Sequence, residues 1–202
     1  MKKFLFWVCL GCLVGCQTLP TSAEWKIRGD GFVQDSKFEQ AIQAYSKAIT
    51  LNSKQADLYA ARGAAYFSIG SYELAKQDFI EALRYNPYQL EAYHALATTL
   101  SIQGDYQEAL ALVNQVLIPT SQNPEIFFTR GGIYFMLQKY EQAVQDYSFV
   151  LQKRPAADVY KARAAAYLEL KEPQKAQADL DAAQSGKYPD KLSDYQLIRG
   201  AN

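Results

Sequence analysis

The residue types that could carry nucleophilic or metal chemistry are few in this 202-residue sequence: three cysteines near its beginning and one histidine, His94. Cys9 and Cys12 have the C-x-x-C spacing of a redox or metal pair, but they lie inside an apolar run. A single histidine cannot form a paired-histidine metal site or an HExxH motif, and neither a G-x-x-x-x-G-K-S/T nor a G-x-S-x-G stretch occurs. We therefore expect no enzyme activity, no metal site and no cofactor.

The third cysteine, Cys16, follows a segment with the features of a signal peptide (residues 1–15). Lys2 and Lys3 precede an apolar run of about a dozen residues, whereas a membrane-spanning helix needs about 20. The run ends in Leu13-Val14-Gly15-Cys16, which resembles the lipobox of bacterial lipoproteins. The resemblance implies cleavage before Cys16, a diacylglyceryl group on its thiol and usually an N-acyl chain such as palmitate. Ordinary signal cleavage after Thr21-Ser22-Ala23 is the alternative.

Removal of this segment would change the thiol content and the charge of the chain. Only the lipidated Cys16 would remain, so neither an internal disulfide nor a cysteine metal site is expected. Loss of Lys2 and Lys3 leaves 19 basic against 21 acidic residues, a net charge of −2. Nucleic-acid binding needs clustered Lys and Arg, and no such cluster is present in the sequence. We expect no nucleic-acid partner.

From Trp25 onward the sequence repeats itself with a period of 34 residues. Each period holds two segments of amphipathic helical spacing, separated near Gly70, Gly104 or Gln138-Lys139. Small residues recur in the first segment at Gly29, Gly63, Ala97, Gly131 and Ala164, and in the second at Ala41, Ala75, Ala109, Ala143 and Ala176. A large apolar residue follows four positions after each of the latter, at Tyr45, Phe79, Val113, Tyr147 and Leu180.

This pattern resembles the tetratricopeptide repeat (TPR), whose motif is W-x-x-L-G-x-x-Y, then A-x-x-x-F, then P. The second unit shows it most fully, with Tyr59, Gly63, Tyr66, Tyr72, Ala75, Phe79, Ala82 and Pro87. The resemblance implies an all-α, right-handed solenoid of five helix-turn-helix repeats within 22–186, divided at 22–55, 56–89, 90–123, 124–156 and 157–186, after a lipidated tether at 16–21. Neighbouring units must stack, because one unit cannot bury its apolar stripe alone.

Two segments depart from the regular pattern. Leu117 to Pro124 predicts a longer, proline-bounded connection between the third and fourth units. After the fifth unit, residues 187–202 predict a capping helix and tail, because Leu192, Tyr195 and Ile198 have helical spacing. Pro173, at the start of the last repeat helix, suits a first helical turn.

Arginine and aspartate recur together at a spacing of sixteen residues. The pairs are Arg62 with Asp78, Arg130 with Asp146 and Arg163 with Asp179. The third unit has leucine at both places, Leu96 and Leu112, and the first unit has Arg28 but Ala44. Paired presence and paired absence predict a salt bridge between the two helices of a unit. The alternative is that these positions are simply polar and exposed.

The TPR resemblance also implies a concave groove, lined by the first helices of the units, that accepts peptides or partner helices. Carried over to this sequence, the expected groove residues are Asp57, Phe67, Glu91, His94, Ile102, Glu125, Phe128, Phe135 and Met136. Acids in a first turn also favour the helix dipole, so this structural role is an alternative for Asp57, Glu91 and Glu125. Core packing is the alternative for the aromatic residues.

These features predict a membrane-anchored TPR scaffold that binds envelope proteins or peptides. Gln17, after the lipidated cysteine, is not aspartate, which in a Gram-negative cell implies the outer membrane, facing the periplasm. The chain is similar to TPR lipoproteins that hold murein hydrolases and a periplasmic protease together. It is also similar to those that act as pilotins, so an assembly chaperone for an outer-membrane pilus or secretion subunit is the alternative. The sequence leaves the oligomeric state open.

Overall fold

Residues 19–186 are described by the computed structural model of this chain, and that part is all-α. Its helices follow the 34-residue period in five units: α1 (Ser22–Gln34) and α2 (Phe38–Leu51); α3 (Ala56–Ser68) and α4 (Tyr72–Tyr85); α5 (Leu90–Gln103) with α6 (Tyr106–Leu112), η1 (Val113–Leu117) and α7 (Ile118–Thr120); α8 (Pro124–Met136) and α9 (Tyr140–Lys153); α10 (Ala157–Glu169) and α11 (Pro173–Ser185). The signal peptide, Cys16 and the expected capping helix at 187–202 lie outside the described residues.

The two helices of each unit are joined by two or three residues, one of which has a positive φ. These residues are Ser36, Gly70, Gly104, Gln138 and Lys171. The following N–H then reaches back to a carbonyl five residues earlier, as from Ser71 to Tyr66 at 2.9 Å and from Lys139 to Tyr134 at 2.8 Å. This left-handed turn closes the first helix and reverses the chain.

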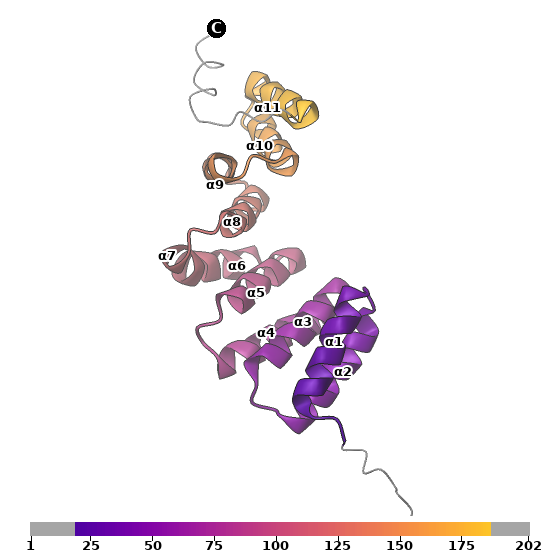
Figure 1. Cartoon of the computed structure of the whole chain (residues 1–202). Coiled ribbons are helices and arrows are strands. Elements are labelled where there is room, and N and C mark those ends of the chain that lie inside the picture. Colours follow the sequence, from indigo (N-terminus) through magenta and orange to yellow (C-terminus); the bar gives the residue numbers. More distant parts are fainter. Residues whose placement is uncertain (1–18, 187–202) are drawn as a thin grey trace, which may run out of the picture.

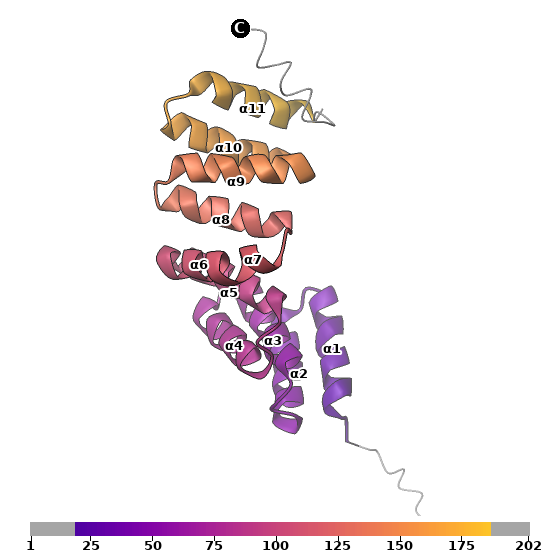
Figure 2. The ribbon, with the colours of Figure 1, turned by 90° about the vertical axis from the view of Figure 1, so that its left-hand side faces the viewer.

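The units stack in chain order. Each first helix contacts its own second helix, and α2, α4 and α9 also contact the first helix of the next unit. Figures 1 and 2 show the helices following one another from α1 at one end to α11 at the other. This is the solenoid expected from the repeats.

One pair of residues in each unit determines how closely its two helices can approach each other. A Cβ atom on Gly131 would lie 2.7 Å from Tyr147 Cε1, and one on Gly63 would lie 2.9 Å from Phe79 Cε1. The first unit repeats this with Gly29 and Tyr45. The third and fifth units carry alanine instead, Ala97 and Ala164, and there the second helix offers Val113 and Leu180. Glycine therefore occurs where the opposite residue is aromatic, and alanine where it is aliphatic.

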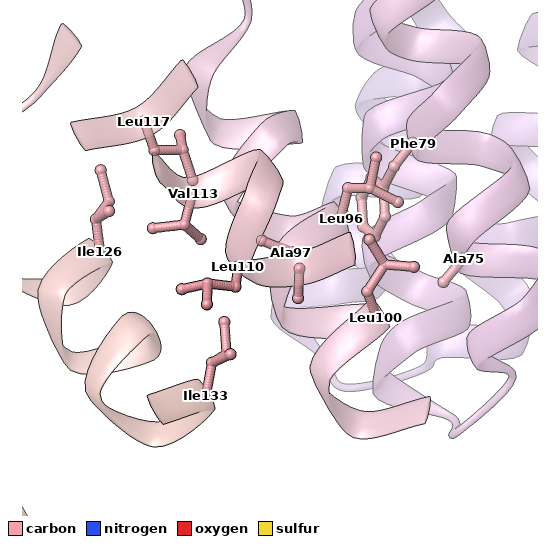
Figure 3. Close-up of a cluster of buried hydrophobic side chains, with 11 residues drawn as sticks. Ala75, Phe79, Leu96, Ala97, Leu100, Leu110, Val113, Leu117, Ile126 and Ile133 are labelled. Atoms are coloured by element: carbon pink, nitrogen blue, oxygen red, sulfur yellow. The ribbon is translucent and has the colours of Figure 1, made fainter. Parts of the chain in front are cut away.

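The largest buried apolar cluster joins the second, third and fourth units. In Figure 3, Leu110 of α6, Val113 and Leu117 of η1, and Ile126 and Ile133 of α8 point toward one another, while Phe79 and Leu96 lie on the side of α4 and α5. Leu117 and Val113 are fully buried. The third unit is thus packed on both sides.

The second helix of the third unit differs from the sequence prediction. Leu117 to Pro124 predicts a longer connection, but the helix continues through Thr120 and only residues 121–123 connect it to α8. Burial of Leu117 keeps the chain helical. Pro119 has no N–H to donate to the preceding turn, and the helix widens to a π-helix at Val113–Leu117 just before it. The Thr120 hydroxyl donates to the Val116 carbonyl at 2.6 Å.

The helix face that packs against a neighbouring unit becomes polar at the α11 end of the stack and partly polar at the α1 end. On α9 this face carries Val144, Ser148 and Leu151, whereas the same positions of α11 are Gln177, Asp181 and Gln184, all exposed. At the other end, α1 has an exposed Glu24 at the position of the buried Leu58, Ile126 and Val159, but it also has Ile27, 68% exposed, at the position of the partly buried Ala61. The surface that a capping helix is expected to cover is therefore polar.

Candidate functional site

The structure brings together the three arginine–aspartate pairs that the sequence predicts. Arg62 donates from Nε and Nη2 to the two carboxylate oxygens of Asp78, both at 2.8 Å. Arg130 with Asp146 and Arg163 with Asp179 show the same two-point geometry, at 2.8 and 2.7 Å in each pair. Each pair joins the two helices of one unit, and this parallel arrangement is the stronger form of a charged hydrogen bond.

The pairs are not exposed polar residues. The side chains of Arg163 and Asp179 are 7% and 3% exposed, and those of Arg62 and Asp78 are 20% and 8%. The hydrogen bonds that Arg130 donates to Asp146 raise the pKa of Arg130, and those that Arg62 donates to Asp78 raise the pKa of Arg62. These are structural ion pairs within the stack.

Each arginine also reaches the preceding unit, which the sequence prediction did not include. Arg62 Nη1 donates to Ser46 Oγ at 3.0 Å, Arg130 Nη1 to Asn114 Oδ1 at 3.0 Å, and Arg163 Nη1 to Ser148 Oγ at 2.9 Å. The partners stand fifteen or sixteen residues before the arginine, and this spacing is the signal that could have found them. One guanidinium therefore ties three helices together.

The first helices also have one side that is turned largely toward solvent. Three rows of residues lie on it, at the second, ninth and twelfth or thirteenth positions of each first helix. Consecutive first helices α3, α5, α8 and α10 contact one another directly, so the face continues from unit to unit. We call this surface the A face.

The predicted acids lie at one edge of the A face, where the first helices begin. Asp57, Glu91 and Glu125 are exposed, as is Asp158 in the fifth unit. Glu125 pairs with Arg154 at 3.0 Å, and Arg154 Nη2 lies 4.0 Å from Asp158. Asp57 accepts a hydrogen bond from Gln89 at 3.3 Å. This row is therefore partly neutralised in the last two units.

The predicted aromatic residues are half-buried. The Phe67 and Phe135 rings pack edge-on against Tyr72 and Tyr140, with ring centroids 5.4 Å apart in each case. The ring centroids of Phe128 and Tyr147 are 5.7 Å apart. Each ring thus packs against its own unit and remains partly exposed, and a role in binding stays a prediction.

Ile102 and Met136 are the predicted residues with the greatest apolar exposure, at 49% and 53%. Leu168 in the fifth unit is 55% exposed. All three lie at the end of a first helix, at the edge of the A face opposite the acids. The third, fourth and fifth units thus each present one of these apolar side chains.

His94 connects two units on the A face. Its Nε2 lies 2.8 Å from the Thr129 hydroxyl, and that hydroxyl donates to the Glu125 carbonyl at 3.0 Å. Because the hydroxyl has a single proton, His94 is assigned as the donor through Nε2–H. Burial lowers the pKa of His94, and the nearby Glu125 opposes this. The imidazole is thus a packing residue between α5 and α8.

Within residues 19–186, His, Cys, Asp and Glu side chains form no group that could hold a metal ion. No helix in that part of the chain is long and apolar enough to cross a membrane. The arrangement offers a surface for binding.

Four models of the tetratricopeptide repeat match the chain, at residues 29–70, 56–89, 79–111 and 129–191. Together they span most of the described repeats.

Among curated proteins, the chain is 31% identical over 96 residues to a "Lipoprotein NlpI homolog" of Haemophilus influenzae, covering 48% of this chain and 31% of that protein. It is 25% identical over 116 residues to the BBSome complex member BBS4 of Bos taurus, covering 57% of this chain and 22% of that protein. The chain thus spans less than a third of the length of either relative.

Among solved structures, a MamA protein superposes with a TM-score of 0.71 at 18% identity, covering 81% of this chain and 90% of that one. A MamA fragment from Desulfovibrio magneticus gives 0.75 at 13% identity, covering 81% and 93%. These likenesses show the fold. The four repeat models, which together match residues 29–111 and 129–191, show that the chain belongs to the tetratricopeptide-repeat family, whose members generally bind other proteins.

Proposed function

We propose that this protein is a lipid-anchored scaffold of the bacterial envelope, which binds other envelope proteins through the A face and holds them beside a membrane. The observation that carries the proposal is the row of uncovered apolar side chains, Ile102, Met136 and Leu168, across consecutive first helices. An apolar row at the rim of a continuous surface is typical of a protein-binding site. The protein acts by binding and carries out no catalysis.

The anchor part of the proposal rests on the sequence. The lipobox-like Leu13-Val14-Gly15-Cys16 and the similarity of the repeats to a lipoprotein homolog both favour lipidation of Cys16. Several acyl chains give stable attachment, whereas one alone is marginal. In a Gram-negative cell, Gln17 favours the outer membrane, facing the periplasm.

Metabolic labelling tests the anchor. Cells grown with radioactive palmitate should label the wild-type chain, and the Cys16→Ala variant should remain unlabelled and leave the membrane fraction. Equal labelling of both chains would exclude lipidation at Cys16. Membrane retention of the variant after cleavage elsewhere would point to another means of attachment.

Photo-crosslinking in cells tests the scaffold. A crosslinking amino acid at Met136 should capture discrete proteins, while one at Lys175, on the exposed side of α11, should not. Cell-wall enzymes or proteases among the captured proteins would support recruitment. A pilus or secretion subunit would instead support the assembly chaperone. Capture from Lys175 alone would place the binding surface on the second helices and contradict the proposal.

A further inference from the structure

We infer that the edge of the stack where α1 begins and α2 ends rests on the membrane surface and contacts anionic lipid headgroups. The inference rests on the proposed lipid anchor and adds a contact between the folded repeats and the bilayer. We call this surface the tether edge and define it by Leu19, Trp25, Arg28, Lys47 and Leu51. Figures 1 and 2 show the start of α1 and the end of α2 together at the lower end of the first unit.

The short tether keeps this edge close to the bilayer. Thr21, which caps α1, is the fifth residue after Cys16. At about 3.5 Å per residue, even a fully extended chain places Thr21 no more than about 17 Å from a lipidated Cys16. Trp25 is four residues further on, which is about 6 Å along the helix axis. A lipid on Cys16 therefore holds the first unit within reach of the headgroups.

Apolar side chains are exposed at the tether edge. Leu19 is 89% exposed and Leu51 is 58% exposed. Leu51 has the position that Tyr85 has in the second unit, where Tyr85 stacks on Tyr59 with ring centroids 5.5 Å apart. Since Trp25 has the position of Tyr59, Leu51 lies on the same side of its unit as Trp25. The edge thus combines an indole ring with two exposed leucines.

Two cations flank the indole ring of Trp25. Lys47 Nζ lies 4.3 Å from the ring centroid and Arg28 Cζ lies 4.6 Å from it. Among the described residues, neither cation has a carboxylate partner within 4 Å. Arg28 stands at the position of the ion-paired arginines, but its unit carries Ala44 in place of the aspartate. Both charges are therefore available to lipid phosphates.

The acids near this edge do not cancel its positive charge. The Glu24 carboxylate accepts hydrogen bonds from the Thr21 N–H at 2.7 Å and from its hydroxyl at 3.1 Å, at the positive end of the helix dipole. Lys54, in the α2–α3 connection, is a third exposed cation, and Asp57 is the second acid. Three cations against two acids leave a surplus of one positive charge, which favours an anionic surface.

This combination of side chains suits the boundary between lipid and water. Tryptophan is enriched there because its ring is apolar while its N–H stays hydrated. Lysine and arginine have long apolar stems that place their charges among anionic headgroups. Contact along this edge would hold the stack in one orientation on the membrane, whereas a tether alone would let it rotate.

Trp25 can report this contact directly. It is the only tryptophan after the signal peptide, and Cys16 is the only cysteine, because Trp7, Cys9 and Cys12 all precede residue 16. The whole chain from residue 16 can therefore be coupled through the Cys16 thiol to a maleimide lipid in vesicles. This coupling supplies the anchor chemically and leaves the rest of the chain unchanged.

The vesicles contain phosphatidylcholine with about one third phosphatidylglycerol, which is anionic. We expect the Trp25 emission to shift to shorter wavelengths on coupling. Lipids brominated near the headgroup should quench about half of this emission, and lipids brominated near the chain ends should quench less, because the ring lies at the interface. Quenching should be weaker in vesicles of phosphatidylcholine alone and at high salt.

Matched variants connect the quenching to the tether edge. Lys47→Glu with Leu51→Ser should remove most of the quenching without lowering the melting temperature. Lys139→Glu with Leu74→Ser makes the same changes at the opposite edge, where the second helices begin, and should behave as the wild type. Because Lys47 lies over the indole, the emission of each variant is compared with its own emission in vesicles without bromine.

The inference fails if the coupled wild type shows no quenching, or if the Lys47 and Leu51 variant is quenched equally. Equal quenching with and without phosphatidylglycerol would contradict the choice of anionic headgroups. A shift that grows with coupling density but is insensitive to bromine would mean that a second copy covers Trp25. Since the maleimide lipid supplies the anchor, these failures leave the palmitate and Met136 crosslinking tests unaffected. Failure of those tests with quenching retained would contradict the proposed function alone.

Discussion

Arg130 and Asp146, sixteen residues apart in the sequence, meet in a two-point ion pair in which Nε and Nη2 donate to the two carboxylate oxygens at 2.8 and 2.7 Å. The third bond, from Nη1 to Asn114 of the preceding unit, makes the same guanidinium part of the interface between units. The Phe127 and Tyr134 rings lie 5.3 and 5.5 Å from its central carbon. The Arg130 side chain thus contributes both to the packing within its own unit and to the stacking on the preceding unit.

Breaking this ion pair on one side should be costly. Asp146→Ala leaves a largely buried guanidinium without its main partner, and we expect a loss of about 3 kcal/mol in the free energy of unfolding. Replacing both residues, Arg130→Leu with Asp146→Leu, should recover most of this loss, because the third unit carries Leu96 and Leu112 at the same places. Urea unfolding of the wild type, the Asp146→Ala variant and the double variant measures these differences in the free energy of unfolding. A double variant no more stable than Asp146→Ala would show that the charge itself is needed.

Gly131→Ala should destabilise the fourth unit. Its new Cβ would lie 2.7 Å from the Tyr147 ring, and overpacking of this kind costs about 1–3 kcal/mol. Tyr147→Leu should relieve the clash, because Ala164 and Leu180 already form that combination in the fifth unit. A thermodynamic cycle of the wild type, the two single variants and the double variant measures the coupling. Additive effects would contradict a direct contact between the two residues.

Two exposed glycines should respond to alanine in opposite directions. Gly31 lies within α1 with open space around it, so Gly31→Ala should stabilise the chain by about 0.5–1 kcal/mol through helix propensity. Gly104 has a φ of 89°, so Gly104→Ala should cost about 1–2 kcal/mol. Melting temperatures of the two variants check the signs. A shift in the same direction for both would refute this account of the turn.

His94 should make folding stability depend on pH. Burial lowers its pKa in the folded chain, so the unfolded chain binds a proton first as the pH falls below about 6.5. The free energy of unfolding should therefore decrease between pH 7 and pH 5, and this part of the decrease should vanish in His94→Gln. Urea midpoints at several pH values give the two curves. Parallel curves would mean that other groups cause the change.

The units and the ion pairs are predictable from the sequence because both depend on contacts within one period. Paired loss of arginine and aspartate in the third unit identifies the partners from residue types and spacing alone. The bonds to Ser46, Asn114 and Ser148 are harder to predict, because only their spacing of fifteen or sixteen residues recurs, and serine and asparagine are common on exposed helices. The helical course of Leu117 to Thr120 differs from the prediction because it depends on burial against α8, a contact between units.

The acids and aromatics of the A face were only partly predictable, for a related reason. A carboxylate in a first turn has the same local pattern whether or not it is paired, and the partner of Glu125 is Arg154, in the connection to the following unit. Likewise, the contacts of Phe67 and Phe135 with Tyr72 and Tyr140 determine how much of each ring remains exposed. Residue type located these side chains, and tertiary contacts determined their exposure.

The polar outer face of α11 affects how molecules of this protein can associate with one another. A head-to-tail contact between identical stacks does not close into a ring unless its rotation permits, and otherwise produces an open filament. Gln177, Asp181 and Gln184 on α11 replace the apolar side chains that drive stacking elsewhere, whereas α1 exposes both Glu24 and Ile27. The polar face of α11 therefore disfavours growth of the solenoid from one molecule to the next.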